Sequence, residues 1–156
     1  MPRFAIEVMY DGTCFHGSQV QGDQMTVQYV INKSLSTLFR QPIETLGASR
    51  TDEGVHALCN LYHFDLPEEP TIDVLYKCNA IMPPSISARK LFRASDTFNA
   101  RFDALSRAYR YRVYQKKNPF LVGRALFTPF PLQEELLHQT AQILMEYSDV
   151  ESFAKR

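Results

Sequence analysis

The stretch Leu58-Cys59-Asn60-Leu61-Tyr62-His63-Phe64 is mostly apolar, and the fold is expected to form around it. A short apolar run of this kind is typical of a strand inside a sheet, with neighbours on both sides. Glu68-Glu69-Pro70 then ends the run. On the other side, residues 47–57 are rich in glycine and charged side chains, which predicts a loop. The sequence therefore predicts an inner strand that begins at an exposed loop.

The segments around this strand predict the rest of a small sheet domain. Apolar residues at every second position indicate a strand, and spacings of three and four indicate a helix. These patterns predict strands at Phe4–Tyr10, Ile43–Gly47 and Ile86–Arg93, and helices at Thr26–Phe39 and Thr71–Ile81. Thr26 is a candidate N-cap, and prolines follow both helices. The order strand, helix, strand, strand, helix, strand predicts an α+β, ferredoxin-like fold with both helices on one side of an antiparallel sheet.

Beyond residue 95, the sequence predicts one more strand and one more helix. Asp103–Arg107 is polar enough to form a turn, and Ala108–Gln115 alternates strongly, with Tyr109 and Tyr111 on one face. The apolar spacing of Leu132–Tyr147 indicates an amphipathic helix. We therefore expect a single domain over residues 1–156, made of a ferredoxin-like unit at about residues 1–95 and an additional strand and helix in residues 96–156.

Composition restricts the class of protein. The 156 residues are 45% hydrophobic, which is enough for a buried core. Cys14, Cys59 and Cys78 are odd in number and widely spaced, which indicates free thiols in a reducing cytoplasm. No apolar stretch approaches about 18 residues, and Met1-Pro2-Arg3 leads directly into a strand, so neither a membrane span nor a signal peptide is predicted.

The charges balance overall, at 17 basic and 17 acidic residues, but they are unevenly distributed. Residues 89–117 contain only two acidic side chains against Arg89, Lys90, Arg93, Arg101, Arg107, Arg110, Arg112, Lys116 and Lys117. A local positive excess of this kind fits a surface that binds nucleic-acid phosphates. It is also compatible with a solvated strand face, so both interpretations stay open.

The loop before the inner strand reads Gly47-Ala48-Ser49-Arg50-Thr51-Asp52-Glu53-Gly54-Val55-His56-Ala57. A glycine turn exposes Asp52, and Arg50 can keep its carboxylate ionised, because a nearby cation favours the charged form. An ionised, exposed carboxylate can act as a nucleophile. The alternative is ordinary turn chemistry, in which the Asp side chain bonds to backbone N–H groups of its own loop.

Four motifs in the same order are similar to those of the TruA-type tRNA pseudouridine synthases. They are Tyr10–Gln19, Thr26–Gln28 at the start of a helix, the loop 47–57, and residues 98–104 together with 107–111. The loop 47–57 resembles the catalytic loop of the family. Two departures are modest, since Ser18 stands where many members carry Trp and Ser49 where many carry Gly. Neither departure removes a reactive group, although Ser18 alters packing under the first motif.

The resemblance implies an enzyme that isomerises uridine to pseudouridine in tRNA. It implies Asp52 as the nucleophile, Arg50 as the residue that orients it, and Tyr109 as the aromatic ring that stacks on the target base. The Tyr-x-Tyr alternation alone favours an ordinary sheet aromatic at Tyr109, and Tyr111 shares its face. The reaction gains and loses no atoms and has no redox step, so no cofactor or metal is expected, and the sequence has no nucleotide-binding motif.

Binding of tRNA requires contacts that offset the cost of extruding a base, which is a few kcal/mol. The candidates for phosphate contacts are Arg101, Arg107, Arg110 and Arg112, with Lys116 and Lys117 at the rim. The resemblance also places the first-motif loop near the substrate, which makes His16, Gln19 and Gln21 candidates for RNA contact, although solvated loop residues would look the same. The anticodon stem-loop is the part of tRNA that the resemblance suggests.

Family members are usually longer than this chain, so the resemblance implies the first, Asp-bearing part of the fold, ending within a motif at residues 149–156. The alternative function is therefore a non-catalytic RNA- or protein-binding fragment. A cut sheet would expose an edge and apolar surface, which predicts self-association, and the family suggests a homodimer. A zinc site at His56, Cys59 and His63 is not expected, because their offsets along a strand place them on different faces.

Overall fold

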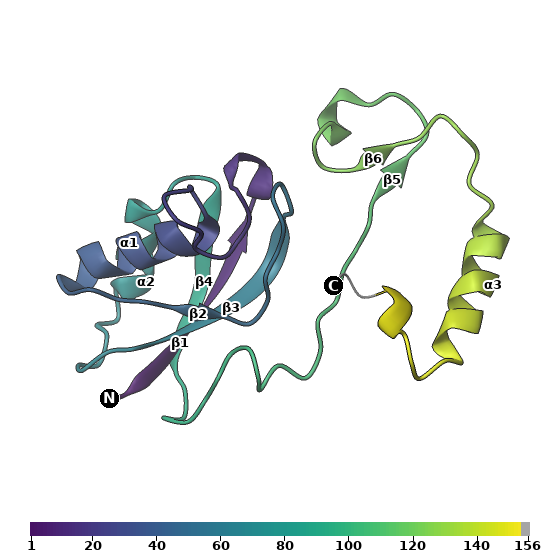
Figure 1. Cartoon of the computed structure of the whole chain (residues 1–156). Coiled ribbons are helices and arrows are strands. Elements are labelled where there is room, and N and C mark those ends of the chain that lie inside the picture. The colour runs from purple at the N-terminus through teal and green to yellow at the C-terminus, as the bar shows by residue number, and fades with distance from the viewer. Residues whose placement is uncertain (154–156) are drawn as a thin grey trace. The chain divides into compact units, whose positions relative to one another are not determined.

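The computed structural model describes residues 1–153 of a chain that forms two compact units, Met1–Ala108 and Tyr109–Arg156 (Figure 1). The first unit contains the larger sheet and the hydrophobic core, whereas the second consists of short elements with exposed side chains. The single-domain organisation stays a prediction. The end of the last motif, residues 154–156, lies outside the described residues.

The first unit is a four-stranded antiparallel sheet with two helices. Its elements are β1 (Arg3–Tyr10), the 3-10 turn η1 (Gly12–Cys14), α1 (Val27–Phe39), β2 (Leu46–Gly47), β3 (Ala57–Asp65), α2 (Val74–Ile81) and β4 (Ile86–Arg93). The strands are ordered β2-β3-β1-β4, and each neighbouring pair is antiparallel. Both helices lie on one side of the sheet (Figure 1). This arrangement confirms the predicted α+β, ferredoxin-like fold with β3 inside the sheet.

The core lies between the sheet and the helices. The alternation of β1 places Phe4, Ile6 and Val8 on the helix side, where each is at most 1% exposed. They pack in one cluster with Tyr62, Phe64, Val27, Ile31, Leu35 and Cys78. Full burial of one large aliphatic side chain contributes about 1.5–3 kcal/mol relative to exposure. The first unit therefore has a hydrophobic core of its own.

Helix α1 begins and ends where the sequence predicts, for local reasons. The side-chain oxygen of Thr26 accepts a hydrogen bond from the backbone N–H of Tyr29 at 3.3 Å, which makes Thr26 the N-cap. At the other end, Arg40 adopts a left-handed conformation with φ 55°. A residue in this conformation cannot continue the helix, which therefore stops before Pro42.

Strand β2 is shorter than the strand predicted at Ile43–Gly47. Side chains of α1 bind the backbone groups that a strand would use. The hydroxyl oxygen of Ser36 accepts from the N–H of Ile43 at 2.8 Å, and Asn32 Oδ1 accepts from the N–H of Thr45 at 3.1 Å. Helix α2 likewise starts three residues later than predicted, because the chain first makes a turn there.

Strand β4 lies at one edge of the sheet, and a side chain from α2 occupies this edge. Asn79 accepts a hydrogen bond from the N–H of Ala88 and donates one to the carbonyl of the same residue, both at 2.8 Å. These two outward backbone groups are the ones that another strand would bind. The sheet edge is therefore interrupted near its middle by Asn79.

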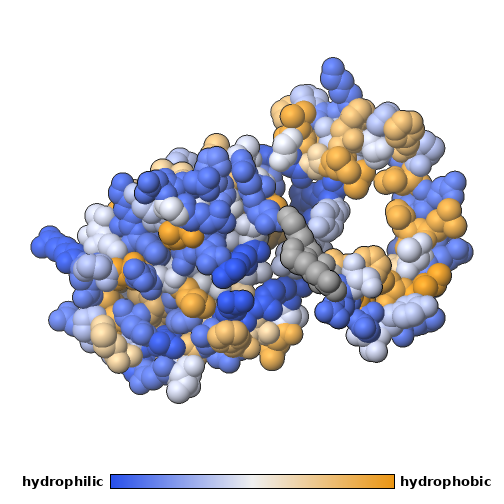
Figure 2. All heavy atoms as spheres, viewed as in Figure 1, coloured by the Kyte–Doolittle hydropathy of each residue, from blue (hydrophilic) through white to orange (hydrophobic). Residues whose placement is uncertain are grey.

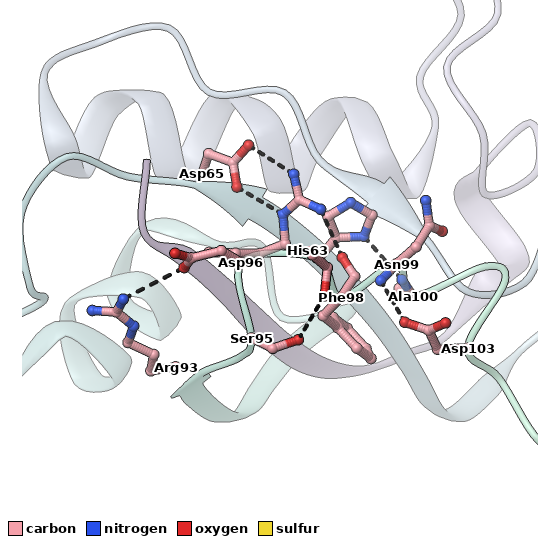
Figure 3. A network of polar contacts seen from close by, with 11 residues as sticks. His63, Asp65, Arg93, Ser95, Asp96, Phe98, Asn99, Ala100 and Asp103 are labelled. Carbon is pink, nitrogen blue, oxygen red and sulfur yellow. Dashed lines mark hydrogen bonds and ion pairs between the residues drawn. The ribbon is translucent and has the colours of Figure 1, made fainter.

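A network of polar contacts ties the segment after β4 to the sheet (Figure 3). Arg3 pairs with Asp65 at 2.8 Å and donates to the carbonyl of Phe98 at 2.7 Å. The N–H of buried Ala100 donates to Nδ1 of His63 at 3.1 Å. Burial, and then the charge of Arg3, lower the pKa of His63, which keeps its ring neutral and able to accept this bond. The residues after Ala100 therefore start from a fixed backbone.

The second unit contains β5 (Val113–Tyr114), η2 (Pro119–Leu121), β6 (Leu126–Phe127), α3 (Glu134–Met145) and η3 (Glu151–Phe153). Strands β5 and β6 form a parallel pair. No residue between Tyr109 and Phe153 is buried, and apolar side chains lie at the surface of this unit (Figure 2). Helix α3 confirms the helix predicted at Leu132–Tyr147 to within two residues at each end.

The strand predicted at Ala108–Gln115 is wrong for most of its length. Only β5 forms, where the N–H of Leu126 donates to the carbonyl of Arg112 at 2.8 Å and that of Thr128 donates to the carbonyl of Tyr114 at 3.0 Å. Within residues 1–153, positions 108–112 have no strand beside them. A strand is stabilised by backbone hydrogen bonds to a neighbouring strand. The alternation of side chains alone therefore does not determine where this strand forms.

Candidate active site

Two loops meet at the end of the sheet where β1 ends and β3 begins. The first loop comprises residues 11–20 and the second loop residues 48–56. Gly12 permits the approach, because a Cβ there would lie 2.0 Å from the carbonyl oxygen of Val55. The backbone N–H of Gly12 also donates to Nδ1 of His56 at 3.0 Å. Backbone contact between the two loops therefore depends on a residue without a side chain.

Thr51 is bound through all three of its polar groups. Its N–H donates to the side-chain oxygen of Ser18 at 2.7 Å, and its carbonyl accepts from the N–H of Ser18 at 2.9 Å. Its hydroxyl lies 2.8 Å from the hydroxyl of Tyr10. Thr51 directly precedes Asp52, so these contacts fix the backbone from which the candidate nucleophile extends.

A buried polar side chain supports the second loop from below. Asn60 on β3 is 4% exposed, and its amide nitrogen donates to the carbonyl of Ser49 at 3.0 Å. The same nitrogen lies 3.4 Å from the hydroxyl of Tyr10 and 3.3 Å from that of Tyr62. Burial raises the pKa of Tyr62, so its hydroxyl stays neutral. Asn60 Oδ1 is buried and has no hydrogen-bond partner within residues 1–153.

The side chains of Asp52 and Arg50 are both exposed at the tip of the second loop. The carbonyl of Asp52 accepts from the N–H of Val55 at 3.2 Å, and Gly54 has φ 76°, so the chain turns directly after the carboxylate. Within residues 1–153, no ion pair joins Arg50 to Asp52. The structure therefore brings the two residues onto one loop without direct contact between their charges.

Of the first-loop candidates, His16 lies beside the second loop and Gln19 lies beside a pocket. Nδ1 of His16 is 3.5 Å from the carboxylate of Glu53, the residue after Asp52. The pocket has a volume of about 110 Å³, and its lining includes Gln19, Arg50 and Arg101. The fold therefore brings three predicted site residues, distant in sequence, to one pocket.

Arg107 has contacts different from those predicted for a phosphate ligand. Its Nε and one terminal nitrogen both donate to the carbonyl of Ala48, at 3.1 and 2.8 Å. The same terminal nitrogen donates to the carbonyl of Arg101 at 2.7 Å. Arg107 therefore connects the start of the second loop to the backbone of Arg101.

The remaining candidates lie in the second unit. Tyr109 is 63% exposed and Tyr111 is 92% exposed. Arg110 and Arg112 are exposed as well. Asp52 belongs to the first unit and Tyr109 to the second, so the expected stacking role of Tyr109 stays a prediction.

Part of the basic segment is already neutralised by acidic side chains. Arg89 and Lys90 both approach the carboxylate of Glu7, at 3.8 and 3.7 Å. Arg93 pairs with Glu69 at 3.0 Å and with Asp96 at 3.4 Å. The capacity for phosphate binding in the first unit therefore resides less in β4 than in the residues that follow it.

The three cysteines are free thiols, as predicted. Burial raises the pKa of Cys78 to about 11, which makes it an inert core residue. Burial, and then the charge of Glu7, also raise the pKa of Cys59. Among residues 1–153, no group of three or more His, Cys, Asp or Glu side chains has the arrangement of a metal site.

Sequence reasoning missed the residues that hold the second loop. In the sequence, Ser18 stands out only as a departure from the family motif, whereas in the structure its N–H and hydroxyl oxygen both bind Thr51. Asn60 carried a usable signal, because a polar side chain within an apolar strand usually has a specific partner. Thr51 carried no such signal, since its partners are far away in the sequence.

The fold and the site together define a class of protein. It is an α+β domain that exposes a carboxylate on a loop whose backbone is held by hydrogen bonds. No family model matches the chain. Proteins named tRNA pseudouridine synthase A are similar to it along nearly all of its length. Those of Bacteroides thetaiotaomicron and Parabacteroides distasonis are each 39% identical over 99% of this chain, and that of Thermotoga neapolitana is 38% identical over 98%.

The chain is thus similar to these tRNA pseudouridine synthase A proteins along nearly all of its own length, and it spans 58%, 62% and 64% of their respective lengths. This result confirms the family resemblance found in the four motifs. None of the helices within residues 1–153 has the length and apolar character needed to cross a membrane.

Proposed function

We propose that this chain carries the catalytic carboxylate of a tRNA pseudouridine synthase, which isomerises uridine to pseudouridine with Asp52 as the nucleophile. The observation that carries the proposal is the loop of Asp52. Its backbone is held through every polar group of Thr51, while the carboxylate itself is exposed and has no partner within residues 1–153. A nucleophile must be held in position and must be free to reach a substrate atom, and a carboxylate without partners on a fixed backbone meets both requirements.

The reaction breaks the bond between the ribose and N1 of uracil and joins the ribose to C5 of the same base. The proton leaves C5 and N1 gains one, so the product is an isomer of the substrate and no oxidant or other reactant is required. If Asp52 bonds to C1′ of the ribose, the bond from C1′ to N1 breaks as that bond forms, and Asp52 leaves when C5 bonds to C1′. If Asp52 bonds to the base instead, it leaves once the ribose is joined to C5. Arg50 places a positive charge on the same loop, two residues before Asp52.

The RNA is bound by basic and aromatic side chains around this loop. We assign Arg101, Arg110 and Arg112 to phosphates, and His16 and Gln19 to the RNA strand beside the second loop. Tyr109 stacks on the extruded uracil, a contact of about 1–3 kcal/mol. The anticodon stem-loop of tRNA is the proposed substrate region, the cytoplasm the location and a homodimer the assembly. The homologues' names support tRNA as the substrate.

Release of tritium from tRNA that contains [5-³H]uridine tests the proposal, because the C5 proton is lost only if C5 becomes the point of attachment. We expect release with the 156-residue chain and none with Asp52→Asn. Glu53→Gln is the matched control, since it removes the neighbouring exposed carboxylate and leaves Asp52 in place. Release that persists in Asp52→Asn, or a chain that binds tRNA without release, would contradict the proposal for this chain.

A further inference from the structure

The arginines of the first unit differ in what they contact. Arg3, Arg89 and Arg93 pair with carboxylates, and Arg107 binds two backbone carbonyls. Within residues 1–153, the guanidinium groups of Arg40, Arg50 and Arg101 have neither an ion pair nor a hydrogen bond. Arg101 only lies over the ring of Phe102, 5.5 Å from its centre. Three positive groups are therefore available to an external anion.

Two of these three arginines line the same pocket. Arg50 and Arg101 line the pocket of about 110 Å³ beside the second loop, and no carboxylate belongs to its lining. A guanidinium group has five N–H donors and no acceptor, so two arginines that line one pocket suit an anion with several oxygens. Arg40 lies apart from them, at the C-terminal end of α1.

The position of Arg101 is determined by its own turn and by Arg107. The side-chain oxygen of Asn99 accepts from the N–H of Arg101 at 3.0 Å, and Asp103 accepts from the N–H of Asn99 at 2.8 Å. Arg107 then joins the carbonyl of Arg101 to that of Ala48 at the start of the second loop. These bonds bring Arg101 to the pocket that Arg50 also lines.

We propose that Arg50 and Arg101 together bind one backbone phosphate of the RNA, and that Arg107 is the positioning residue that assembles this site. The identity of the anion as RNA phosphate rests on the proposed function. Planar guanidinium groups bind phosphate oxygens through paired, charge-assisted hydrogen bonds. Arg50 is two residues from Asp52, so the bound phosphate belongs to a nucleotide next to the one that reacts.

The assignment of Arg107 differs from a phosphate contact in a testable way. Three of its hydrogen bonds already go to carbonyls, and they need the forked geometry of arginine. A lysine at this position keeps the charge but has no fork. Arg107→Lys therefore separates a positional role from a role that depends on charge alone.

The first experiment measures the affinity of the 156-residue chain for an RNA hairpin at several KCl concentrations. Loss of one phosphate contact is expected to weaken binding and to reduce the slope of log K against log salt by about 1. We expect this result for Arg50→Gln and for Arg101→Gln. Arg40→Gln is the matched control, since it removes an equally unpaired arginine outside the pocket, and its affinity and slope should equal those of the wild type.

The second experiment repeats these measurements with Arg107→Lys alone and combined with Arg101→Gln. We expect Arg107→Lys to lose as much affinity as Arg101→Gln, and the double variant to lose no more than either single one, because both changes disable the same site. Wild-type affinity in Arg107→Lys would overturn the positioning role. Equal effects of Arg101→Gln and Arg40→Gln, or no hairpin binding by the wild type, would overturn the phosphate site.

Inorganic phosphate tests whether the pocket binds a free anion instead of a phosphate of the RNA backbone. If the pocket serves a free anion, phosphate will perturb the NMR signals of residues 49–51 while Arg101→Gln leaves hairpin binding unchanged, and the RNA assignment then fails. The measurements record binding and not isomerisation. Failure of this site is therefore distinguishable from failure of the proposed activity, which the tritium assay with Asp52→Asn decides separately.

Discussion

At the scale of single residues, the neighbours of Asp52 explain its accessibility. Thr51 uses its two backbone groups to bind Ser18 of the first loop and its hydroxyl to contact Tyr10 of β1, so the backbone is fixed without help from the Asp52 side chain. A carboxylate bound by its own turn would be satisfied and less reactive, which was the alternative interpretation of the sequence. The observed division of roles leaves Asp52 available to a substrate.

His63 makes a pH prediction at this scale. Its pKa is lower in the folded chain than its ordinary value of 6.5, because burial and Arg3 disfavour the charged ring. The unfolded chain therefore binds more protons below this value, and stability is expected to fall as the pH decreases from about 7.5 to about 5. One such group contributes at most about 1.4 kcal/mol per pH unit. Urea denaturation across this range measures the slope.

The control for this prediction is a pair of variants. His63→Gln should flatten the slope, whereas His138→Gln on the exposed face of α3 should leave it unchanged. Arg3 lowers the pKa of Asp65 below its ordinary 3.8, chiefly through their hydrogen bond. The stability that this ion pair contributes is lost only at still lower pH. An identical slope in His63→Gln and the wild type would rule out the assigned role of His63.

The sequence predicts a role for Asp52 because its surroundings form a continuous motif. It did not identify the partners of Thr51, because Tyr10 and Ser18 reach the second loop only after β1 and β3 have paired. Such contacts depend on which segments lie side by side, and residue types alone do not specify that. Asn60 was the one supporting residue whose polarity within an apolar strand pointed to a role.

At the scale of elements, the sequence predicts correctly the helices and strands whose ends are set by nearby residues, and less well those that depend on a distant partner. Strand β4 and helix α1 have the predicted bounds, since their patterns, the N-cap Thr26 and the following prolines are all local. Strand β2 is short because α1 supplies hydrogen bonds to its approach, and residues 108–112 form no strand without a neighbour. Information about partners was not present in the alternation of apolar and polar residues.

Gly12 gives a prediction at the element scale, because it governs how closely the two loops approach. Gly12→Ala should force them apart, since the added carbon would meet the carbonyl oxygen of Val55. We expect a loss of about 2 kcal/mol or more in the free energy of unfolding, together with loss of tritium release. Gly22→Ala is the control, because nothing lies within 4 Å of that position and only its φ of 49° opposes a side chain.

Comparable stability of the two glycine variants, measured by urea denaturation, would mean that the loops adjust without cost. The control itself should lose about 1 kcal/mol, the usual penalty for a side chain in a left-handed conformation. The difference between the variants therefore reports the close approach and not the conformational freedom of glycine.

At the scale of the whole molecule, the two units differ in how much they bury. The first has a continuous core from β1 to β4, whereas no described residue of the second is buried. Helix α3 leaves Leu136, Leu137, Ile143 and Leu144 between 43% and 56% exposed. Contiguous apolar surface of this kind favours association between molecules.

We therefore expect the whole chain to self-associate through its second unit. A fragment of residues 1–108 retains the core and should stay monomeric at the same concentration. Sedimentation velocity across a concentration series measures both. A monomeric whole chain would count against the prediction, and a fragment that associates equally would move the contact surface to the first unit.

Asn79 restricts the side of the sheet on which a further strand can be added. Its amide closes the β4 side to strand addition at Ala88, whereas β2 covers only Tyr62 and His63 on the opposite side of β3. Within residues 1–153, residues 57–60 of β3 pair with no strand on that border, directly after the loop of Asp52. A strand that joins this sheet, from the same chain or another, enters beside the carboxylate of Asp52. The place for an added strand and the carboxylate of Asp52 therefore share one border of the sheet.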